Sequence, residues 1–190
     1  QTSAVVALEA LGRGCADNGL GFAIGAHLWG CLTMVLAGDR EHNASLISDL
    51  ATGQKIGSLA VSEPGAGSDV SAIATRADAT SHGYRLDGHK IYVTNAPVGD
   101  VFVVLAATGG GGSAFGHTAF CVERGTPGLE VSEPVAKMGM RTAAMGEVIL
   151  QNCRIPASSR IGAEGAGLAL FLKAMEAERA FVLAPAVGAM

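Results

Sequence analysis

Residues 58–69 read Ser-Leu-Ala-Val-Ser-Glu-Pro-Gly-Ala-Gly-Ser-Asp, and this stretch carries more functional information than any other part of the chain. A strand-like apolar run ends at Val61, and a polar loop containing Pro64, Gly65 and Gly67 follows it. Glycine lets the backbone approach a ligand closely, and successive turn amides form a concave set of hydrogen-bond donors. The stretch therefore predicts a loop that binds the electron-rich edge of a ligand.

The composition predicts a folded protein with a substantial core. The chain has 190 residues, of which 49% are hydrophobic and 16% are charged, which argues against disorder. The formal net charge of −4 argues against general nucleic-acid binding. The four cysteines form no C-x-x-C pair and the histidines show no metal-ligand spacing. We therefore expect reduced thiols, a location in the bacterial cytoplasm, and no metal site.

One apolar run is long enough to span a bilayer. Gly19 to Gly38 carries no charge unless His27 is protonated. Its several glycines and the lack of flanking basic clusters favour a buried helix in a helical layer, so we expect no membrane association. Gln1 is not an initiator residue and Met190 falls within a helical pattern, so we expect the sequence to be a fragment of a longer chain.

The hydrophobic period changes twice along the chain, which divides it into three parts. Residues 1–56 read as helices, including one over 20–37 and another through Leu46–Leu50 that Asn43 or Ser45 would cap. From 57 to 160 apolar and polar residues alternate with the two-residue period of β-strands, and the Asp87-Gly88 pair indicates a hairpin. The expected strands include 101–106, 118–123, 129–131 and 148–150, with a loop over 109–116. From 161 to 190 the helical period returns and a helix is expected from Gly167 to the end. The predicted class is α+β, with an antiparallel β domain in the middle.

Several motifs in this order resemble those of the acyl-CoA dehydrogenase family. They are the 58–69 loop, Leu-Asp-Gly-His-Lys-Ile-Tyr-Val-Thr-Asn at 86–95, the segments 120–130 and 148–156, Lys-Met-Gly-Met-Arg at 137–141, and the glycines of 162–167 leading to Glu178-Arg179. The resemblance implies the end of an N-terminal helical domain, a middle β barrel or sandwich, and the first helix of a C-terminal helical bundle. It also implies an FAD enzyme that removes the α-proton of an acyl thioester with a carboxylate while the β-hydrogen leaves as hydride to flavin N5.

The resemblance assigns cofactor roles to two segments. Val61, Ser62, Gly67 and Ser68 would contact the flavin through backbone amides and hydroxyls. In the second segment Tyr92 would cover the ring and the Thr94 hydroxyl would lie near N5; the two-residue period of a strand places them on one face. Many relatives have Trp in place of Tyr92. Each segment also has a purely structural interpretation. The first would be a Pro-Gly turn that closes a strand, and the second a Tyr-Thr pair on the surface of a β-sheet.

Glu178 is the candidate catalytic base. It shares a helix face with apolar residues at helical spacing (Phe171, Ala174, Met175, Phe181, Val182 and Pro185). Burial of a carboxylate in such a stripe raises its pKa, which suits a general base; Glu176 falls on the opposite, solvated side. Isovaleryl- and long-chain-type members carry the base in this helix directly before an arginine, which matches Glu178-Arg179. Ser68, Met175 and Arg179 would contact the substrate.

Alternatives and partners follow from the resemblance. Glu178 would instead be a structural acid if the base lay in a C-terminal segment, as it does in most members. A flavin monooxygenase of the same fold and a non-catalytic family-like subunit are the other interpretations. For the leading one we expect an acyl-CoA or acyl-carrier-protein substrate, an electron-transfer flavoprotein as oxidant, and a homotetramer or homodimer. Glu63 and Asp69 are expected to accept hydrogen bonds from loop amides.

Overall fold

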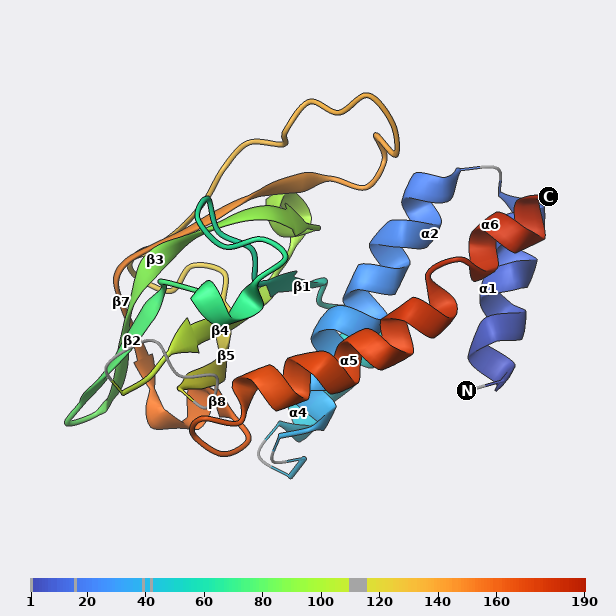
Figure 1. The fold of residues 1–190 in the computed structure, drawn as a ribbon. Helices are drawn as coiled ribbons and strands as arrows, with labels where there is room; N and C mark the ends of the chain where they lie inside the picture. Colours follow the sequence, from blue (N-terminus) through green and yellow to red (C-terminus); the bar gives the residue numbers. More distant parts are fainter. Residues whose placement is uncertain (1, 16, 39, 42, 110–115) are drawn as a thin grey trace.

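The computed structural model describes residues 2–15, 17–38, 40–41, 43–109 and 116–190. In these residues a curved sheet lies beside a layer of helices, and helix α5 (Gly167–Phe181) runs from the sheet back across that layer (Figure 1). The helices are α1 (Thr2–Gly14), α2 (Asn18–Gly25), α3 (Thr33–Leu36), α4 (Ala44–Thr52), α5 and α6 (Ala184–Ala189). The strands are β1 (Gly57–Ala60), β2 (Arg76–Thr80), β3 (Gly83–Thr94), β4 (Val101–Ala107), β5 (His117–Glu123), β6 (Leu129–Val131), β7 (Met145–Pro156) and β8 (Arg160–Ile161).

The apolar helix expected over 20–37 is present and has an unusual middle. α2 continues through a π-helical segment, Ala26–Leu32, into α3, so that Asn18–Leu36 is one helix. By length and composition it could cross a membrane. In the structure it contacts β1 and α5, and Cys31, Met34 and Val35 on it are fully buried in a shared core, as in the core helix of a folded domain.

The sheet is mostly antiparallel, in the order β6-β7-β3-β2-β4-β5-β8, with β1 paired to β4. Two pairings are parallel, β1 with β4 and β2 with β4, which the expectation of a purely antiparallel domain did not include. The loop expected over 109–116 falls largely on residues 110–115, which lie outside the described part of the chain. All four cysteines are free thiols.

The hairpin predicted at Asp87-Gly88 is wrong. β3 runs straight through these residues, and the turn that reverses the chain is at Ser81-His82, between β2 and β3. At Asp87 the pairing of β3 with β7 shifts register instead, and the Asp87 carboxylate accepts a hydrogen bond from the Asn152 amide at 2.7 Å. The extra residue of this bulge is on β7, where Asn152 has a φ of 50°. Gly88 stays in the strand, where a Cβ would lie 2.2 Å from the Thr75 hydroxyl oxygen, so the glycine serves close packing and not a turn.

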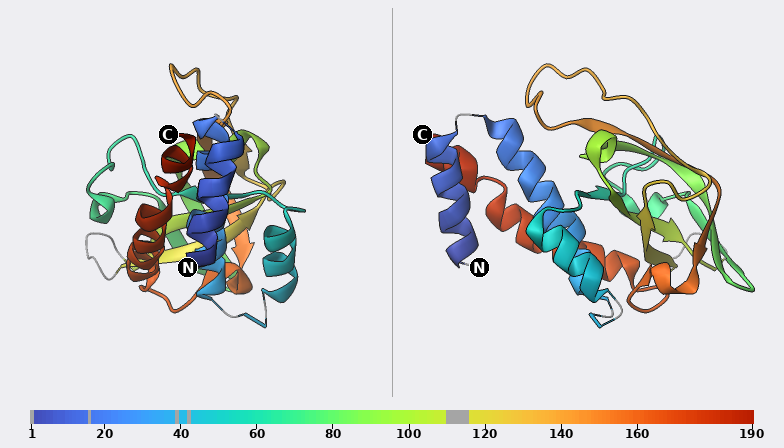
Figure 2. Two further views of the ribbon diagram at one scale, coloured as in Figure 1. Left: turned by 90° about the vertical axis from the view of Figure 1, so that its right-hand side faces the viewer. Right: turned by 180° about the vertical axis from the view of Figure 1, so that it is seen from behind.

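The single helix predicted from Gly167 to the end is also wrong, because it is two helices. α5 ends at Phe181 and α6 begins at Ala184, with Pro185 in its first turn. Proline has no amide hydrogen and cannot continue a helix interior, whereas the first turn of a new helix accepts it. α6 then lies against α1 (Figure 2). Gly12 is needed there, since a Cβ on it would lie 1.9 Å from the Pro185 carbonyl oxygen.

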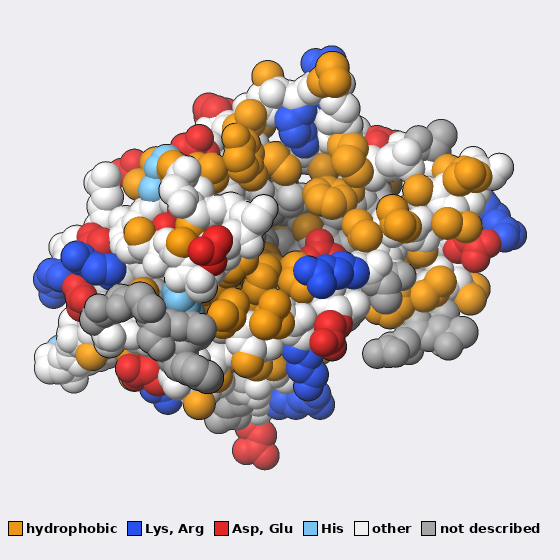
Figure 3. Space-filling view, viewed as in Figure 1, with side chains coloured by type: hydrophobic (Ala, Val, Ile, Leu, Met, Phe, Trp, Pro, Cys, Tyr) orange, Lys and Arg blue, Asp and Glu red, His pale blue; other side chains and the backbone are white. Residues whose placement is uncertain are grey.

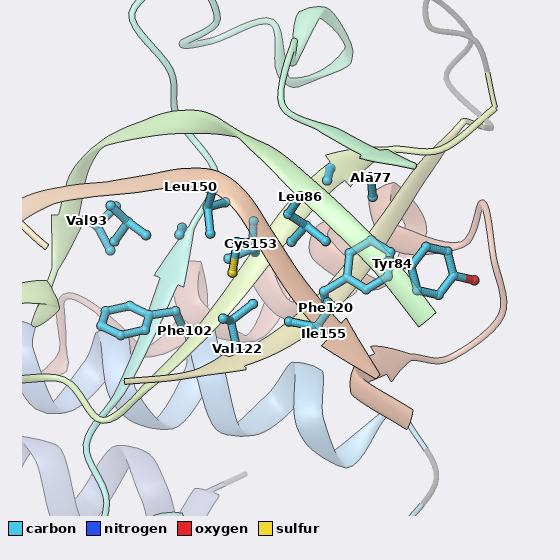
Figure 4. Close-up of a cluster of buried hydrophobic side chains, with 14 of the residues drawn as sticks. Ala77, Tyr84, Leu86, Val93, Phe102, Phe120, Val122, Leu150, Cys153 and Ile155 are labelled. Carbon is cyan, nitrogen blue, oxygen red and sulfur yellow. The ribbon is translucent and has the colours of Figure 1, made fainter. Parts of the chain in front are cut away.

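Two cores lie on opposite faces of β4. Phe102, Val104 and Ala106 point into a cluster enclosed by the curved sheet, where the Tyr84 and Phe120 rings lie 4.8 Å apart (Figure 4). Val101, Val103 and Leu105 point into a second cluster, shared with the helices. Burial of alternate residues on both faces explains the continuous apolar run of this strand. The second cluster fixes the sheet against α5 and the Asn18–Leu36 helix, and the candidate site lies along this junction.

Candidate active site

A cavity of about 240 Å³ lies where α5, the Asn18–Leu36 helix, the loop after β1 and the end of β3 meet. Figure 3 shows apolar side chains gathered on the face formed by α5 and the adjoining sheet. Seven of the nine residues singled out from the sequence line this cavity: Val61, Ser62, Gly67, Tyr92, Thr94, Met175 and Glu178. Segments more than 100 residues apart in the chain therefore meet in one site. Ser68 and Arg179 do not line it and are exposed.

The loop after β1 is held by hydrogen bonds within itself and to β3. The amide of Glu63 donates to the Ala66 carbonyl at 2.9 Å, and the Ala66 amide donates back at 3.1 Å. The Ile91 amide of β3 donates to the Ser62 carbonyl at 2.8 Å. A Cβ on Gly67 would meet no atom within 4 Å, so its backbone is open to a ligand. The loop is therefore tied to β3 and leaves the backbone at Gly67 accessible.

A buried ion pair under this loop was not predicted. Lys90 on β3 is 0% exposed, and its Nζ donates to Glu63 Oε1 at 2.7 Å and to the Val61 carbonyl at 3.0 Å. The Glu63 carboxylate also accepts the amides of Ala74 and Thr75, at 2.7 and 3.0 Å, as expected for loop amides. A signal for Lys90 was present in the sequence. It lies four residues after Leu86, so a regular strand places both side chains on the same buried face.

Tyr92 and Thr94 reach the cavity through an irregular strand. The pairing of β3 with β7 shifts register between Lys90 and Val93, and Tyr92 has a φ of 55°, in the left-handed region that non-glycine residues rarely adopt. Its ring is exposed, at 65%, and both Tyr92 and Thr94 line the cavity. Both residues therefore line one cavity, but the strand between them is irregular and does not follow the two-residue period from which their common face was predicted.

Asp69, which follows the loop, has the structural role expected of it. Its carboxylate accepts a hydrogen bond from the Ser71 amide at 3.0 Å, at the start of the short helix Val70–Ala72. The Ser71 hydroxyl and amide lower the pKa of Asp69. Both acids beside the loop, Glu63 and Asp69, thus bind backbone amides.

Glu178 lies on α5 in half-buried surroundings. Burial raises the pKa of its carboxyl, and the neighbouring Arg179 guanidinium opposes the rise. Among the described residues, its carboxylate has no hydrogen-bond partner. Phe171 and Met175 precede it by two turns and one turn of the same helix and line the same cavity. Glu176 is exposed, as the helical spacing predicts. The arrangement presents an unpaired carboxylate of raised basicity to a mainly apolar cavity.

A larger cavity, of about 430 Å³, lies between α4, β5 and the end of β7. Its walls contain none of the nine candidate residues, and its cation, Lys55, is already paired with Asp49 and Glu123. We therefore assign the chemistry to the smaller cavity.

Comparison with known proteins agrees with this geometry. Residues 58–153 match the model of the acyl-CoA dehydrogenase middle domain. The chain is 42% identical over 190 residues to the L-prolyl-[peptidyl-carrier protein] dehydrogenase of Pseudomonas fluorescens, covering 99% of the chain and 50% of that protein. It is 33% identical to the mitochondrial isovaleryl-CoA dehydrogenase of Solanum tuberosum, covering 97% and 45%. The solved structure "PigA with FAD and proline" superposes with a TM-score of 0.94 at 38% identity, covering 97% and 49%.

The family model covers half of the chain and the fold agrees along nearly all of it, so the chain belongs to the acyl-CoA dehydrogenase family. It spans about half the length of the curated relatives that it matches. The predicted family and fold class are thus confirmed.

Proposed function

We propose that the complete protein is an FAD-dependent dehydrogenase that oxidises the α,β-bond of an acyl thioester. The observation that carries this proposal is the presence of Glu178, with its raised pKa, in the same cavity as the predicted flavin contacts. Proximity of a base to a cofactor-binding loop is the arrangement that proton abstraction coupled to oxidation requires.

The lining residues fit a flavin. The open backbone at Gly67 and the anchored strand end at Val61 and Ser62 offer close approach and amide donors to the edge of a ring system. The exposed Tyr92 ring is a plane on which a second ring can stack, and the Thr94 hydroxyl is a hydrogen-bond donor beside it. When bound, FAD supplies the two-electron acceptor, taking the β-hydrogen of the substrate as hydride at N5.

Glu178 removes the other hydrogen. Its carboxylate takes the α-proton, which the thioester carbonyl acidifies, and the electron pair of the broken C–H bond forms the new α,β double bond. A raised pKa makes the ionised carboxylate a stronger base. Phe171 and Met175 form an apolar wall beside Glu178, which disfavours its ionised form. Ser68 and Arg179 are exposed, so their proposed substrate contacts would involve parts of the thioester that extend beyond the cavity.

For the substrate we propose a small cyclic aminoacyl group on a carrier protein, namely L-prolyl. Support comes from the relatives: identity is 42% with the prolyl-carrier enzyme and 33% with the isovaleryl-CoA enzyme. We further infer a homotetramer or homodimer of the bacterial cytoplasm, reoxidised by an electron-transfer flavoprotein; the family resemblance supports this.

The test is the visible spectrum of the complete protein, recorded anaerobically before and after L-prolyl-carrier protein or isovaleryl-CoA is added. We expect a flavin band that bleaches with the prolyl thioester and not with free proline. Bleaching with isovaleryl-CoA alone would overturn the substrate assignment. A flavin that neither thioester bleaches but that air reoxidises rapidly after reduction by a flavin reductase would favour the monooxygenase. A protein that refuses added FAD would favour the non-catalytic subunit.

A further inference from the structure

Lys90 stands out because its ammonium group is fully buried inside the sheet. It projects from the same face of β3 as the core residue Leu86. A buried ammonium is costly unless it is paired and hydrogen-bonded. Its partners are the Glu63 carboxylate and the Val61 carbonyl, and both belong to the loop that lines the candidate site. The lysine thus joins the core of the sheet to that loop.

Glu63 extends the connection to a third segment. Its two carboxylate oxygens accept the amides of Ala74 and Thr75, just before β2, in addition to the Lys90 ammonium. Burial alone would raise the pKa of Glu63, but the Lys90 ammonium and the backbone amide donors together hold it below its usual value. Glu63 is therefore ionised near neutral pH and ties together the loop, β3 and the approach to β2.

The contacts reach the cavity at two points. Lys90 fixes the carbonyl of Val61, and Val61 itself lines the cavity. The residue after Lys90, Ile91, donates its amide to Ser62, which also lines the cavity, and Tyr92 follows directly. One strand segment therefore contacts the loop through Lys90 and Ile91 and carries Tyr92, which lines the same cavity.

We infer that Lys90 is a positioning residue for the cofactor: by donating to Val61 and Glu63 it holds the loop in the conformation that receives the flavin ring, and so sets the affinity and the environment of the bound flavin. This inference rests on the proposed function, which places the flavin in this cavity. Lys90 itself does not line the cavity.

The inference carries a pH dependence. Burial lowers the pKa of Lys90 to about 8, and the Glu63 carboxylate opposes the fall. Within the described residues, Glu63 is the charged group that acts on Lys90. Loss of the proton removes the charge that holds the carboxylate and weakens the contact with Val61. FAD affinity should therefore be constant at neutral pH and decrease as the pH rises through about 8.

The experiment measures FAD binding to the deflavinated complete protein between neutral pH and about 9.5, by quenching of flavin fluorescence. We expect FAD affinity in Lys90→Met to be at least about tenfold weaker, with a changed absorption envelope of the bound flavin and no further loss at high pH. His89→Gln is the matched control. His89 is the neighbouring residue on β3 and pairs with Glu147 at 2.7 Å on the surface, so its replacement should change neither affinity nor pH profile.

Two outcomes would overturn the inference. One is a folded Lys90→Met protein with wild-type affinity and spectrum. The other is an FAD affinity of the wild-type protein that stays constant up to pH 9.5. This measurement can be made even if Lys90→Met does not fold. If the wild-type protein binds no FAD at any pH, the proposed function itself is wrong and this inference is wrong with it. If the wild-type protein binds FAD but neither Lys90→Met nor high pH weakens the binding, only the positioning role of Lys90 is refuted and the proposed function stands.

Discussion

Two buried or half-buried glutamates, one on each side of the candidate site, have opposite surroundings. Glu63 in the loop after β1 accepts hydrogen bonds from an ammonium and two backbone amides, and its pKa is held below the usual value. Glu178 on α5 has no such partners among the described residues, and burial raises its pKa. Both are acids beside the same cavity, but the first has its charge neutralised inside the protein and the second does not.

The difference separates a structural acid from a candidate catalytic one. A carboxylate that accepts hydrogen bonds from an ammonium and two amides stabilises the fold and has little basicity left for a substrate. A carboxylate that is desolvated and unpaired costs stability and is retained where basicity is needed. Residue type and position beside a loop do not distinguish the two glutamates, whereas their hydrogen-bond partners do.

The largest expected effect tests the catalytic side of the comparison. Glu178→Gln in the complete protein keeps the shape of the side chain but removes the base, so kcat for thioester oxidation should fall by about 10²–10⁴-fold while FAD binding stays unchanged. Glu176→Gln, two residues away and exposed, should retain full activity. If Glu178→Gln is fully active in single-turnover bleaching of the flavin, the base lies in another segment.

The next-largest effect tests the structural role of Glu63 through its pairing with Lys90. Lys90→Met alone leaves the Glu63 carboxylate buried without its cation, so the unfolding free energy should fall by about 3–5 kcal/mol. Glu63→Gln added to it removes the unpaired charge and should recover part of the loss. Urea denaturation of both single variants and the double variant measures the coupling. The half-exposed His89–Glu147 pair, between β3 and β7, provides the reference cycle, with about 0–1 kcal/mol expected. Additive effects at Lys90 and Glu63 would refute the pairing.

The smallest effect is the pH dependence of stability at Glu178. Its folded-state pKa is raised by burial, so the native state favours the protonated form. Its stabilising contribution is complete below the unfolded-state pKa and is lost as the pH rises through the folded-state pKa. Glu178→Gln should therefore match the wild type in acid and become the more stable protein toward neutral pH. The gain is about 1.4 kcal/mol for each unit of pKa difference. Urea denaturation at several pH values measures it; a variant that is less stable at neutral pH would mean that Glu178 has a stabilising partner.

Most of the fold could be predicted from the sequence because its patterns are local. The continuous apolar strand, predicted at 101–106 and observed at Val101–Ala107, and the start of α5 at Gly167 follow from hydrophobic period and glycine placement. The parallel pairings of β4 could not be predicted because they join strands that are distant in the sequence. The hairpin error and the single-helix error have a common cause. Asp87-Gly88 and Pro185 are residue types that often end a strand or a helix, and each is compatible with more than one local structure. Whether β3 continues through Asp87 depends on its contacts with β7. Whether the last helix divides at Pro185 depends on contacts with α1.

The candidate site was predicted only in part, because sequence motifs locate contiguous segments but not the contacts between segments. Motif segments located seven of its residues, since each segment is contiguous in the chain. The Lys90–Glu63 pair joins residues 27 positions apart, and no local pattern assigns a partner to a buried lysine. Ser68 and Arg179 adjoin lining residues in sequence, but the structure leaves them exposed outside the cavity.

The positive φ of Tyr92 has a consequence for anyone who stabilises this protein by design. A left-handed backbone costs a non-glycine residue of order 1 kcal/mol or more, and glycine or asparagine at the same position would relieve it. A search guided by thermostability alone would therefore favour replacing Tyr92, and would remove the aromatic plane that we propose covers the flavin. Under the proposed function, stability and activity are in conflict at this position.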